Sequence, residues 1–569
     1  MLQTKKSPEQ ILFIFLGIWT ILNIIQASVV EVHPDEAYYW MYSRFLDWGY
    51  FDHPPMVALF IKIGDFLWPS TLGMRFLTVI SSSLSVFFLW KIVKPYGENI
   101  KLFILLFSAV LLFHVYGFIT TPDAPLFFFT ILFFYVYQKY LASDQLKWAL
   151  LLALVIACLL YSKYHGILVL LFTILSNLSL LKRPSFWLIV GVATLAFFPH
   201  IYWQMENNYP SFYYHVIDRS AAFYKLKFTT EYLLAQLALA GPLVGWFLYR
   251  AAVVLKTPDT FIRAIKVNFF GIFIFFFFST FKGRVEAHWT LPGMICLFIL
   301  AYLYLSNRTV PKWFERLALA NIALILIARL VLLIPIPFLM KNKSVAYYFG
   351  NETWAKQIQE KAGDAPVIFM DSFQEPSKYN YYNRTTKGFS YNSRNYRKNQ
   401  YDIWSLEDSL RNKRVYWVGR DSKGLAGQDT LETSKGLYYG NWIDSVRLYQ
   451  KVSVNPVEKS VLLGKNQPRV LKLRITNPYD EDIYLGNDAG EKWPCVLEYG
   501  YKNGPDLSEF RLVKAANLQK LRIPAKQSVV LNAEILGPKE GGMYKLIFSL
   551  RTDPFSGARN SNMIKAEVH

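Results

Sequence analysis

The segment 31–55 contains the side chains of this chain that are best suited to chemistry. It reads Glu-Val-His-Pro-Asp-Glu-Ala-Tyr-Tyr-Trp-Met-Tyr-Ser-Arg-Phe-Leu-Asp-Trp-Gly-Tyr-Phe-Asp-His-Pro-Pro, so carboxylates, imidazoles and an arginine are mixed with large aromatic rings. Asp35 and Glu36 follow the first long apolar block within a few residues, so we expect them near a membrane surface. Charged groups held at that depth are costly and are usually functional.

A helix start is the structural alternative for the same residues. Proline suits the first turn of a helix and acidic residues favour its positive end, so Pro34-Asp35-Glu36 fits that role. The alternative leaves Asp52 and His53 unexplained. The aromatic side chains fit either an interfacial belt or the wall of a ligand pocket. They are Tyr38, Tyr39, Trp40, Trp48, Tyr50 and Phe51.

The histidines raise the question of a metal site. Imidazole and carboxylate ligands suit zinc or a harder divalent ion, and His33, Asp52, His53 and His288 could supply them jointly. The sequence has no HExxH-like spacing, and a capping or hydrogen-bonding histidine explains the same residues. A divalent metal therefore stays open, and the sequence establishes no cofactor.

Long apolar blocks must position these side chains. The 569 residues are 53% hydrophobic and 17% aromatic, and the apolar residues come in runs. A bilayer core needs about 20 apolar residues per helical span. This predicts a polytopic α-helical membrane protein with eleven spans. The expected spans are roughly 11–30, 73–92, 101–119, 124–141, 147–163, 166–182, 186–204, 231–253, 266–281, 289–306 and 315–338.

The charges of the short loops predict the orientation of these spans. Basic residues such as Lys91, Lys94 and Arg250 gather on one side, which the positive-inside rule assigns to the cytoplasm. The same rule explains the net charge of +20, so nucleic acid is not a predicted partner. An odd number of spans places the C-terminal region outside the cytoplasm. The polar loops expected on that outer face are 31–72, 120–123, 205–230 and 282–288.

The last ~230 residues contain no apolar block of spanning length. Over 341–450, short apolar runs alternate with helix-like polar segments, which favours a small extracytoplasmic α/β domain. Over 451–569, short strands follow one another without helices, which favours an antiparallel β-sandwich. Three domains are therefore predicted, with residues 1–340 as the membrane domain.

Two motifs of the first outward loop resemble a known family. His-Pro-Asp-Glu-Ala-Tyr-Tyr-Trp at 33–40 and Gly-Tyr-Phe-Asp-His-Pro-Pro at 49–55 resemble the first-loop signature of the GT-C glycosyltransferases. The nearest relatives are the bacterial protein mannosyltransferase-like group, which includes the lipid A aminoarabinose transferase. The resemblance is best over 31–125 and excludes the C-terminal region. It implies a GT-C fold in the bacterial inner membrane, with the active site on the periplasmic face and a polyprenyl-phosphate sugar, such as an undecaprenyl-phosphate sugar, as donor.

The resemblance also implies roles for three carboxylates. Asp35 matches the first-loop aspartate that takes the proton of the acceptor, and Glu36 is its adjacent assistant. If the acceptor were already a phosphate, as in lipid A, no strong base would be required and Asp35 would mainly orient groups. Asp123 matches the second carboxylate of the family, although Thr-Pro-Asp at 121–123 is also an ordinary helix start.

Outward cations are the candidates for holding the departing phosphate, because fixed cations stabilise a developing anion. Lys163 lies beside the predicted membrane boundary, where a lipid phosphate would lie and where a lysine can also simply snorkel. The segment 282–289 resembles the family's late His-Trp segment. Some relatives carry lysine where this chain has His53, so the resemblance supports a phosphate contact at that position less strongly. The candidate substrate-binding residues are Arg44, Asp52, His53, Tyr39, Lys163, Arg219, Lys225, Lys282, Arg284 and His288.

The predicted enzyme transfers a sugar from a polyprenyl-phosphate donor to an envelope glycan, lipid or protein acceptor. A lipid A aminoarabinose transferase-like enzyme is the narrower alternative. A membrane transporter is the alternative from another class. Transporters usually bury ionisable residues at the bilayer midplane and show internal repeats, whereas the blocks between 73 and 190 are nearly free of central charges. The β-sandwich could bind a glycan, recruit an acceptor or serve as a structural cap.

Overall fold

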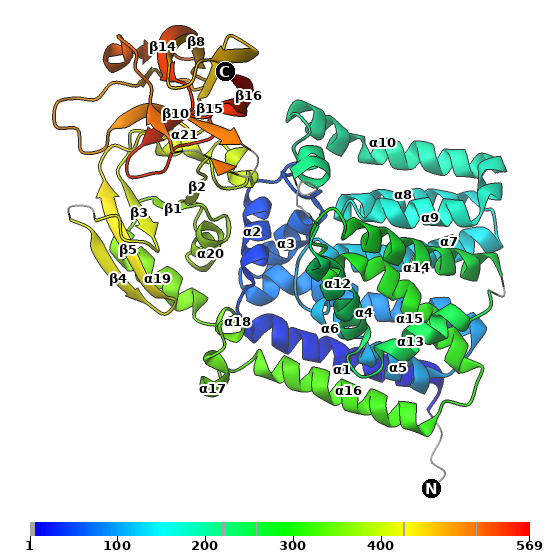
Figure 1. The fold of residues 1–569 in the computed structure, drawn as a ribbon. Coiled ribbons are helices and arrows are strands. Elements are labelled where there is room, and N and C mark those ends of the chain that lie inside the picture. Colours follow the sequence, from blue (N-terminus) through cyan, green and yellow to red (C-terminus); the bar gives the residue numbers. More distant parts are fainter. Residues whose placement is uncertain (1–5, 219–223, 258, 425–426, 504–505, 508) are drawn as a thin grey trace. The chain divides into compact units, whose positions relative to one another are not determined.

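The computed structural model describes residues 6–218, 224–257, 259–424, 427–503, 506–507 and 509–569. Two compact units divide the chain, Met1–Phe349 and Gly350–His569. The first unit is helical and the second is rich in strands (Figure 1).

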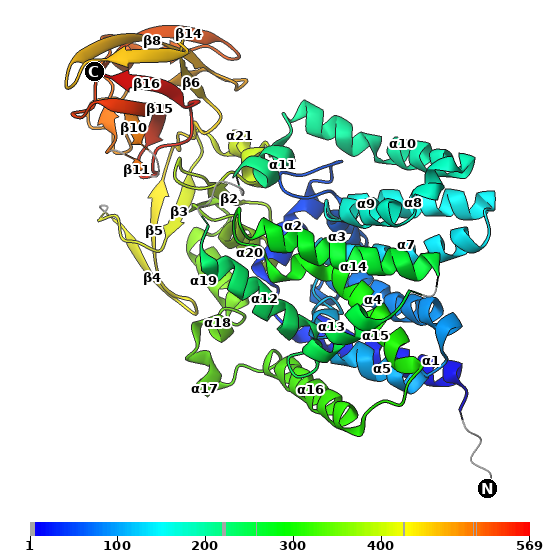
Figure 2. The same ribbon diagram turned by 45° about the vertical axis from the view of Figure 1, so that its right-hand side comes forward.

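Helices of ten or more residues make up most of the first unit (Figure 2). They include α1 (Pro8–Val29), α4 (Thr71–Val93), α5 (Ile100–Ala109), α7 (Asp123–Ala142), α8 (Leu146–Ser162), α9 (Gly166–Ser176), α10 (Pro184–Glu206), α12 (Leu226–Ala240), α13 (Gly245–Val254), α14 (Thr260–Ser279), α15 (Leu291–Ser306) and α16 (Lys312–Val331). Helices α2 (Pro34–Arg44) and α3 (Met56–Leu67), of 11 and 12 residues, follow α1 in the first loop.

Helix α15 forms the centre of this bundle. It is apolar on every side and almost all of its residues are buried, as expected for a helix surrounded by other helices. Its neighbours include α5, α7, α13 and α14. Helices α1 and α10 instead expose rows of large apolar side chains, among them Phe13, Ile21, Leu195 and Phe198. Such surfaces suit contact with lipid rather than water.

The prediction of eleven spans is not confirmed. Among the described residues, six helices are long and apolar enough to cross a membrane, and a seventh is present if α12 and α13, bent by 91°, count as one span. The predicted block 101–119 breaks because α5 ends at Ala109, and 166–182 breaks because α9 ends at Ser176. Hydropathy alone does not reveal such breaks. The orientation, which depends on an odd number of spans, stays a prediction.

A mixed five-stranded sheet opens the second unit, with the strand order β2-β1-β3-β5-β4. Its strands are β1 (Val367–Met370), β2 (Gly388–Tyr391), β3 (Val415–Gly419), β4 (Asp429–Thr433) and β5 (Gly436–Ile443). β1 runs parallel to both β2 and β3. Helices α19 (Asn351–Ala362) and α20 (Gln374–Tyr382) pack on this sheet through Trp354, Ile358 and Tyr379. This arrangement has the predicted α/β character.

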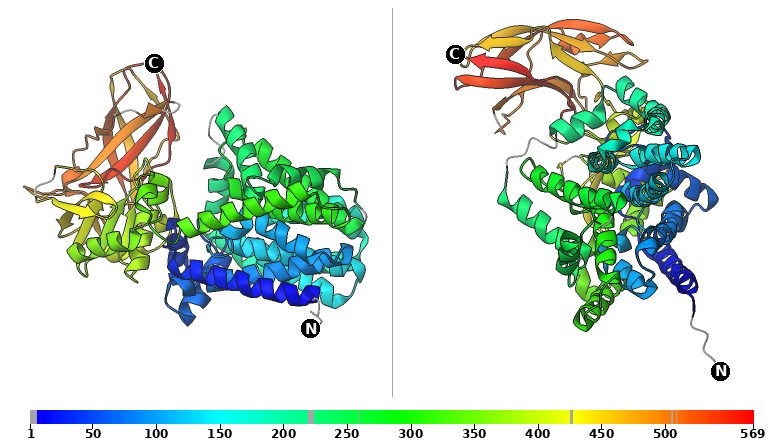
Figure 3. Two further views of the ribbon diagram at one scale, coloured as in Figure 1. Left: turned by 90° about the horizontal axis from the view of Figure 1, so that it is seen from below. Right: turned by 90° about the vertical axis from the view of Figure 1, so that its right-hand side faces the viewer.

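Two further sheets form a β-sandwich around a shared apolar core (Figure 3). The larger contains β7 (Ser460–Leu463), β10 (Cys495–Asn503), β11 (Asp506–Leu507), β12 (Arg511–Leu512), β15 (Gly542–Thr552) and β16 (Ile564–Val568), and the smaller contains β6 (Ser453–Pro456), β8 (Pro468–Thr476) and β14 (Ser528–Leu536). The predicted sandwich is present, but it is not purely antiparallel, because β7 and β16 pair in parallel. The boundary near residue 450 stays a prediction, since both parts lie in one compact unit.

Candidate active site

The first loop of the helical unit begins with a capped helix. The side chain of His33 accepts a hydrogen bond from the backbone N–H of Asp35, and the carboxylate of Glu36 accepts one from the backbone N–H of His33 at 3.0 Å. Pro34 occupies the first turn of α2. The helix-start alternative for these residues is therefore correct, and the carboxylate of Glu36 takes part in the cap.

Glu36 forms a buried ion pair with Arg75 of α4. Both side chains are 0% exposed, and their two hydrogen bonds measure 2.6 and 2.8 Å. Glu36 also accepts the backbone N–H of Thr120 at 2.8 Å, while Arg75 donates to the carbonyls of Ala27, Val30 and Glu31. This pair joins the end of α1, the start of α2 and the segment before α7. We therefore propose that Glu36 supports the site rather than assisting a base.

Asp35 is far more accessible than Glu36, with 38% of its side chain exposed. Its carboxylate lies 3.8 Å from Nδ1 of His33, whose ring packs against the rings of Tyr347 and Tyr348. Burial raises the pKa of Tyr347 to about 12, and the nearby charge of Asp35 adds to this effect. The carboxylate of Asp35 can therefore be reached by a second molecule. A base that takes a proton from an acceptor requires such access.

Asp52 is buried and organises the aromatic part of the loop. The hydroxyl of Tyr42 donates to its carboxylate, and Nε2 of His215 donates to its backbone oxygen at 2.8 Å. Burial, followed by the charge of Asp52, holds the pKa of Tyr42 well above its ordinary value, so this hydroxyl stays a donor. The buried ring of Tyr39 packs between Tyr42 and His53.

Asp123 and Lys163 form a second buried ion pair. Nζ of Lys163, at the end of α8, lies 2.7 and 2.8 Å from the two carboxylate oxygens of Asp123, the first residue of α7. Nε2 of His288 lies 3.6 Å from the same carboxylate. The structure thus brings together three residues that are far apart in the sequence. Because its charge is already matched by Asp123, we propose that Lys163 holds Asp123 in place rather than serving as the main phosphate ligand.

A cavity of about 540 Å³ opens beside this pair. Lys163, Lys282 and Arg284 contribute cations to its lining, and Lys282 and Arg284 are exposed. Phe275, Phe276 and Phe278 at the end of α14, with Trp289, supply an apolar wall. His53, His165 and His215 line the cavity as well. Cations beside an aromatic wall suit a molecule that is part phosphate and part hydrocarbon.

Arg44 has a different environment. It donates to Asp65 of α3 at 2.7 Å and lies 4.6 Å above the ring of Trp40. Trp40 donates to the same carboxylate. We propose that Arg44 fastens α2 to α3. Lys225 is exposed at the start of α12, and Arg219 lies outside the described residues.

The proposed joint metal site at His33, Asp52, His53 and His288 does not assemble. Among the described residues, no three His, Cys, Asp or Glu side chains lie close enough together to hold a metal ion. His33 caps α2 instead, and the carboxylate of Asp52 accepts the hydroxyl of Tyr42.

Comparisons with known proteins concern the fold of this chain. The family profile described as dolichyl-phosphate-mannose-protein mannosyltransferase matches residues 52–203. ArnT from Cupriavidus metallidurans, in the apo state, has a similar structure, with a TM-score of 0.57 and 14% identity over 75% of this chain and 97% of ArnT. The helical unit has the GT-C glycosyltransferase fold. ArnT bound to undecaprenyl phosphate is similar as well, with a TM-score of 0.55 and 15% identity over the same shares. No curated protein matches significantly.

The GT-C resemblance and fold class predicted from the first loop are therefore confirmed. Sequence reasoning missed Arg75, His165 and His215. Nδ1 of His165 is buried without a hydrogen-bond partner among the described residues, and burial with the charge of Lys163 holds the pKa of this imidazole well below its ordinary value. His165 therefore presents a neutral ring to the cavity. The sequence Ser-Lys-Tyr-His at 162–165 was the available signal for His165, but only Lys163 was selected from it as a candidate site residue.

Removing one partner of the Asp123–Lys163 pair should destabilise the helical unit. We expect Lys163→Met to lower the free energy of unfolding by about 1–3 kcal/mol, because it leaves the buried carboxylate of Asp123 without its main counter-charge. Thermal unfolding in detergent micelles measures the effect, with Lys182→Met, an exposed lysine, as the control. Equal stability of the two variants would show that the pair contributes little.

Proposed function

We propose that this chain is an integral membrane glycosyltransferase of the bacterial inner membrane. It transfers a sugar from a polyprenyl-phosphate-linked donor to an envelope glycan, lipid or protein acceptor on the periplasmic face. The observation that carries this proposal is the cavity beside Asp123 and Lys163, which joins exposed cations to an aromatic wall within a GT-C fold. That ArnT of the same fold binds undecaprenyl phosphate supports the assignment.

We propose that two separate hollows, each lined in part by α14, receive the two chemical parts of the donor. Lys282 and Arg284 stand at the cavity and would meet the phosphate. A second, almost wholly apolar hollow of about 420 Å³ lies between α12, α13 and α14, lined by Phe269, Phe273 and Phe277 among others. A prenyl chain that leaves the phosphate would run along this surface, because transfer of its hydrocarbon from water to an apolar groove is favourable.

The proposed reaction is a displacement at the anomeric carbon. A hydroxyl oxygen of the acceptor forms a bond to that carbon while the bond from the carbon to the phosphate oxygen breaks. The lipid phosphate leaves with the bonding electron pair, and Lys282 and Arg284 stabilise its added charge. The acceptor's proton passes to the carboxylate of Asp35. The pairs Glu36–Arg75 and Asp123–Lys163 hold the loops in place without taking part in proton transfer.

Neutralising the exposed cations should weaken the use of the donor. We expect Lys282→Gln and Arg284→Gln each to raise the KM for the polyprenyl-phosphate sugar by about tenfold, because each removes one charged contact to phosphate, worth about 1.5 kcal/mol. Initial transfer rates in membranes, measured against donor concentration, test this. Lys227→Gln is the matched control, since Lys227 is exposed on α12 and pairs with Glu231. An unchanged KM in both variants would place the phosphate elsewhere.

A further inference from the structure

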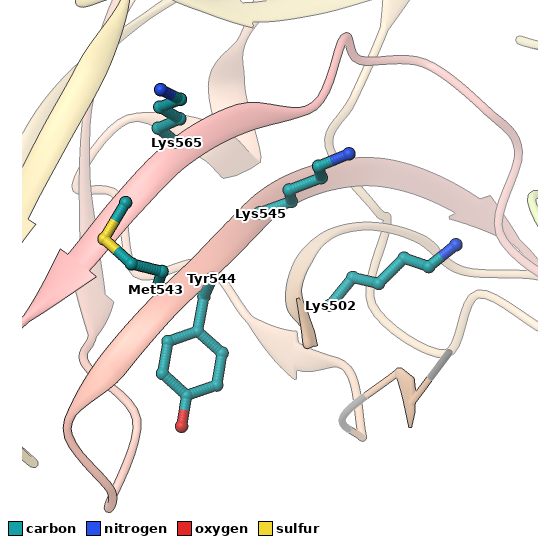
Figure 4. A pocket seen from close by; sticks show the side chains of 5 residues that line it. All are labelled: Lys502, Met543, Tyr544, Lys545 and Lys565. Carbon is teal, nitrogen blue, oxygen red and sulfur yellow. The ribbon is translucent and has the colours of Figure 1, made fainter. Parts of the chain in front are cut away.

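Three lysines form a row across the outer face of the larger sandwich sheet. Lys502 of β10 stands directly opposite Lys545 of β15, and Lys545 stands directly opposite Lys565 of β16. Tyr501, Leu546 and Ala566, the neighbours of these lysines along the strands, point into the sandwich core. Because side chains alternate along a strand, the three lysines share the opposite face. Figure 4 shows them on three neighbouring strands, with the ring of Tyr544 directed away from them.

The row is unfavourable for the fold itself. Like charges directly opposite each other on neighbouring strands are destabilising. The strands lie about 4.8 Å apart, so three ammonium side chains start within about 10 Å of one another. Among the described residues, none of the three has a carboxylate within the 4 Å of an ion pair, whereas Lys514 and Lys526 of the same sandwich do. A bound anion would relieve this repulsion.

The side chains around the three lysines favour an anionic sugar chain over a small inorganic anion as the ligand. The lysines line a shallow hollow of about 290 Å³ together with Met543 and Tyr544. In the next row of the same face, Met543 is paired with Glu567, and Glu567 with Leu462. Met543 and Leu462 are 56% and 64% exposed. An anionic glycan suits this surface. Its charges repeat along the chain and can meet the lysines, and its sugar rings have apolar C–H faces that can meet Met543 and Leu462.

We propose that this lysine row, Lys502, Lys545 and Lys565, binds an anionic glycan through its carboxylate or phosphate groups. The site lies wholly within the strand-rich unit and is separate from the cavity of the helical unit. It is a non-catalytic binding site, so the proposal stands or falls independently of the proposed sugar transfer.

Binding of a fluorescent decagalacturonate to the full chain in detergent micelles tests the proposal. We expect the triple variant K502Q/K545Q/K565Q to bind it at least tenfold more weakly, and salt to weaken the wild type by screening. The matched control K459Q/K472Q/K492Q removes three other exposed lysines of the same sandwich and should change binding less than twofold. Equal losses in the two triples would overturn the proposal.

Two further measurements separate the remaining explanations. Inorganic tripolyphosphate supplies charge without sugar, and competition stronger than that of unlabelled decagalacturonate would overturn the glycan assignment in favour of a free phosphate. The triple lysine variant should keep or slightly raise its melting temperature, because it removes repulsion. A fall would assign the row a structural role and contradict the proposal. The triple K502R/K545R/K565R keeps the charges and should retain binding.

Discussion

Replacement of Asp35 by asparagine is expected to slow transfer to a hydroxyl acceptor by about 10²–10⁴-fold, the range that a positioned general base contributes. The amide keeps the size of the carboxylate but cannot take the acceptor's proton. Asp35 is also partly exposed, in contrast to the fully buried Glu36, so its replacement should leave the fold intact. Initial rates in membranes with a labelled polyprenyl-phosphate sugar measure the effect, and the KM for the donor should stay near the wild-type value.

Glu31→Gln is the control for Asp35→Asn, because it removes a carboxylate four residues earlier in the same loop. Comparing a hydroxyl acceptor with a phosphate acceptor provides a second test of Asp35 as the base. A phosphate acceptor needs no strong base, so Asp35→Asn should then slow transfer much less. Transfer to a hydroxyl acceptor at nearly the wild-type rate would remove Asp35 as the base.

Replacement of Glu36 by glutamine is expected to lower the free energy of unfolding by about 3–5 kcal/mol. The variant leaves the guanidinium of Arg75 without its counter-charge at a place where both side chains are fully buried. Arg75 also donates hydrogen bonds to the carbonyls of Ala27 and Val30 at the end of α1, so the substitution should destabilise the whole first loop. Thermal unfolding of the purified chain in micelles measures it. Glu98→Gln, which removes an exposed acid paired with Lys94, should change the stability little.

The double variant Glu36→Leu/Arg75→Leu separates a structural from a catalytic role. Removing both charges avoids the uncompensated buried ion, so the double variant should be more stable than Glu36→Gln alone. A Glu36→Gln protein of wild-type stability that has lost transfer activity would contradict the structural assignment. It would instead support the role as an assistant to the base that the family resemblance implied.

The sequence was informative where a signal is local. Apolar blocks predicted most helices of the first unit, and alternating strands predicted the sandwich. The motif at 33–40 predicted both the capped start of α2 and the GT-C fold, because capping and the family signature depend on neighbouring residues.

Features that depend on distant pairing were not predictable in the same way. Arg75 lies 39 residues from Glu36 and at the start of an apolar block, so nothing local pointed to their ion pair. Lys163 was selected as a candidate phosphate ligand, and nothing local pointed to its partner Asp123, which lies 40 residues away. The count of eleven spans is not confirmed for a related reason, since mean hydropathy cannot locate the helix ends at Ala109 and Ser176.

The central claim, transfer of a sugar from a polyprenyl-phosphate donor, is tested most directly by mass spectrometry of the envelope after deletion of the gene. Lipids, glycans and secreted proteins are compared between the deletion strain and the same strain carrying the gene again. We predict loss of one sugar modification together with accumulation of the matching polyprenyl-phosphate sugar, both restored on complementation. Envelope lipids, glycans and proteins that are identical in the two strains would contradict the account.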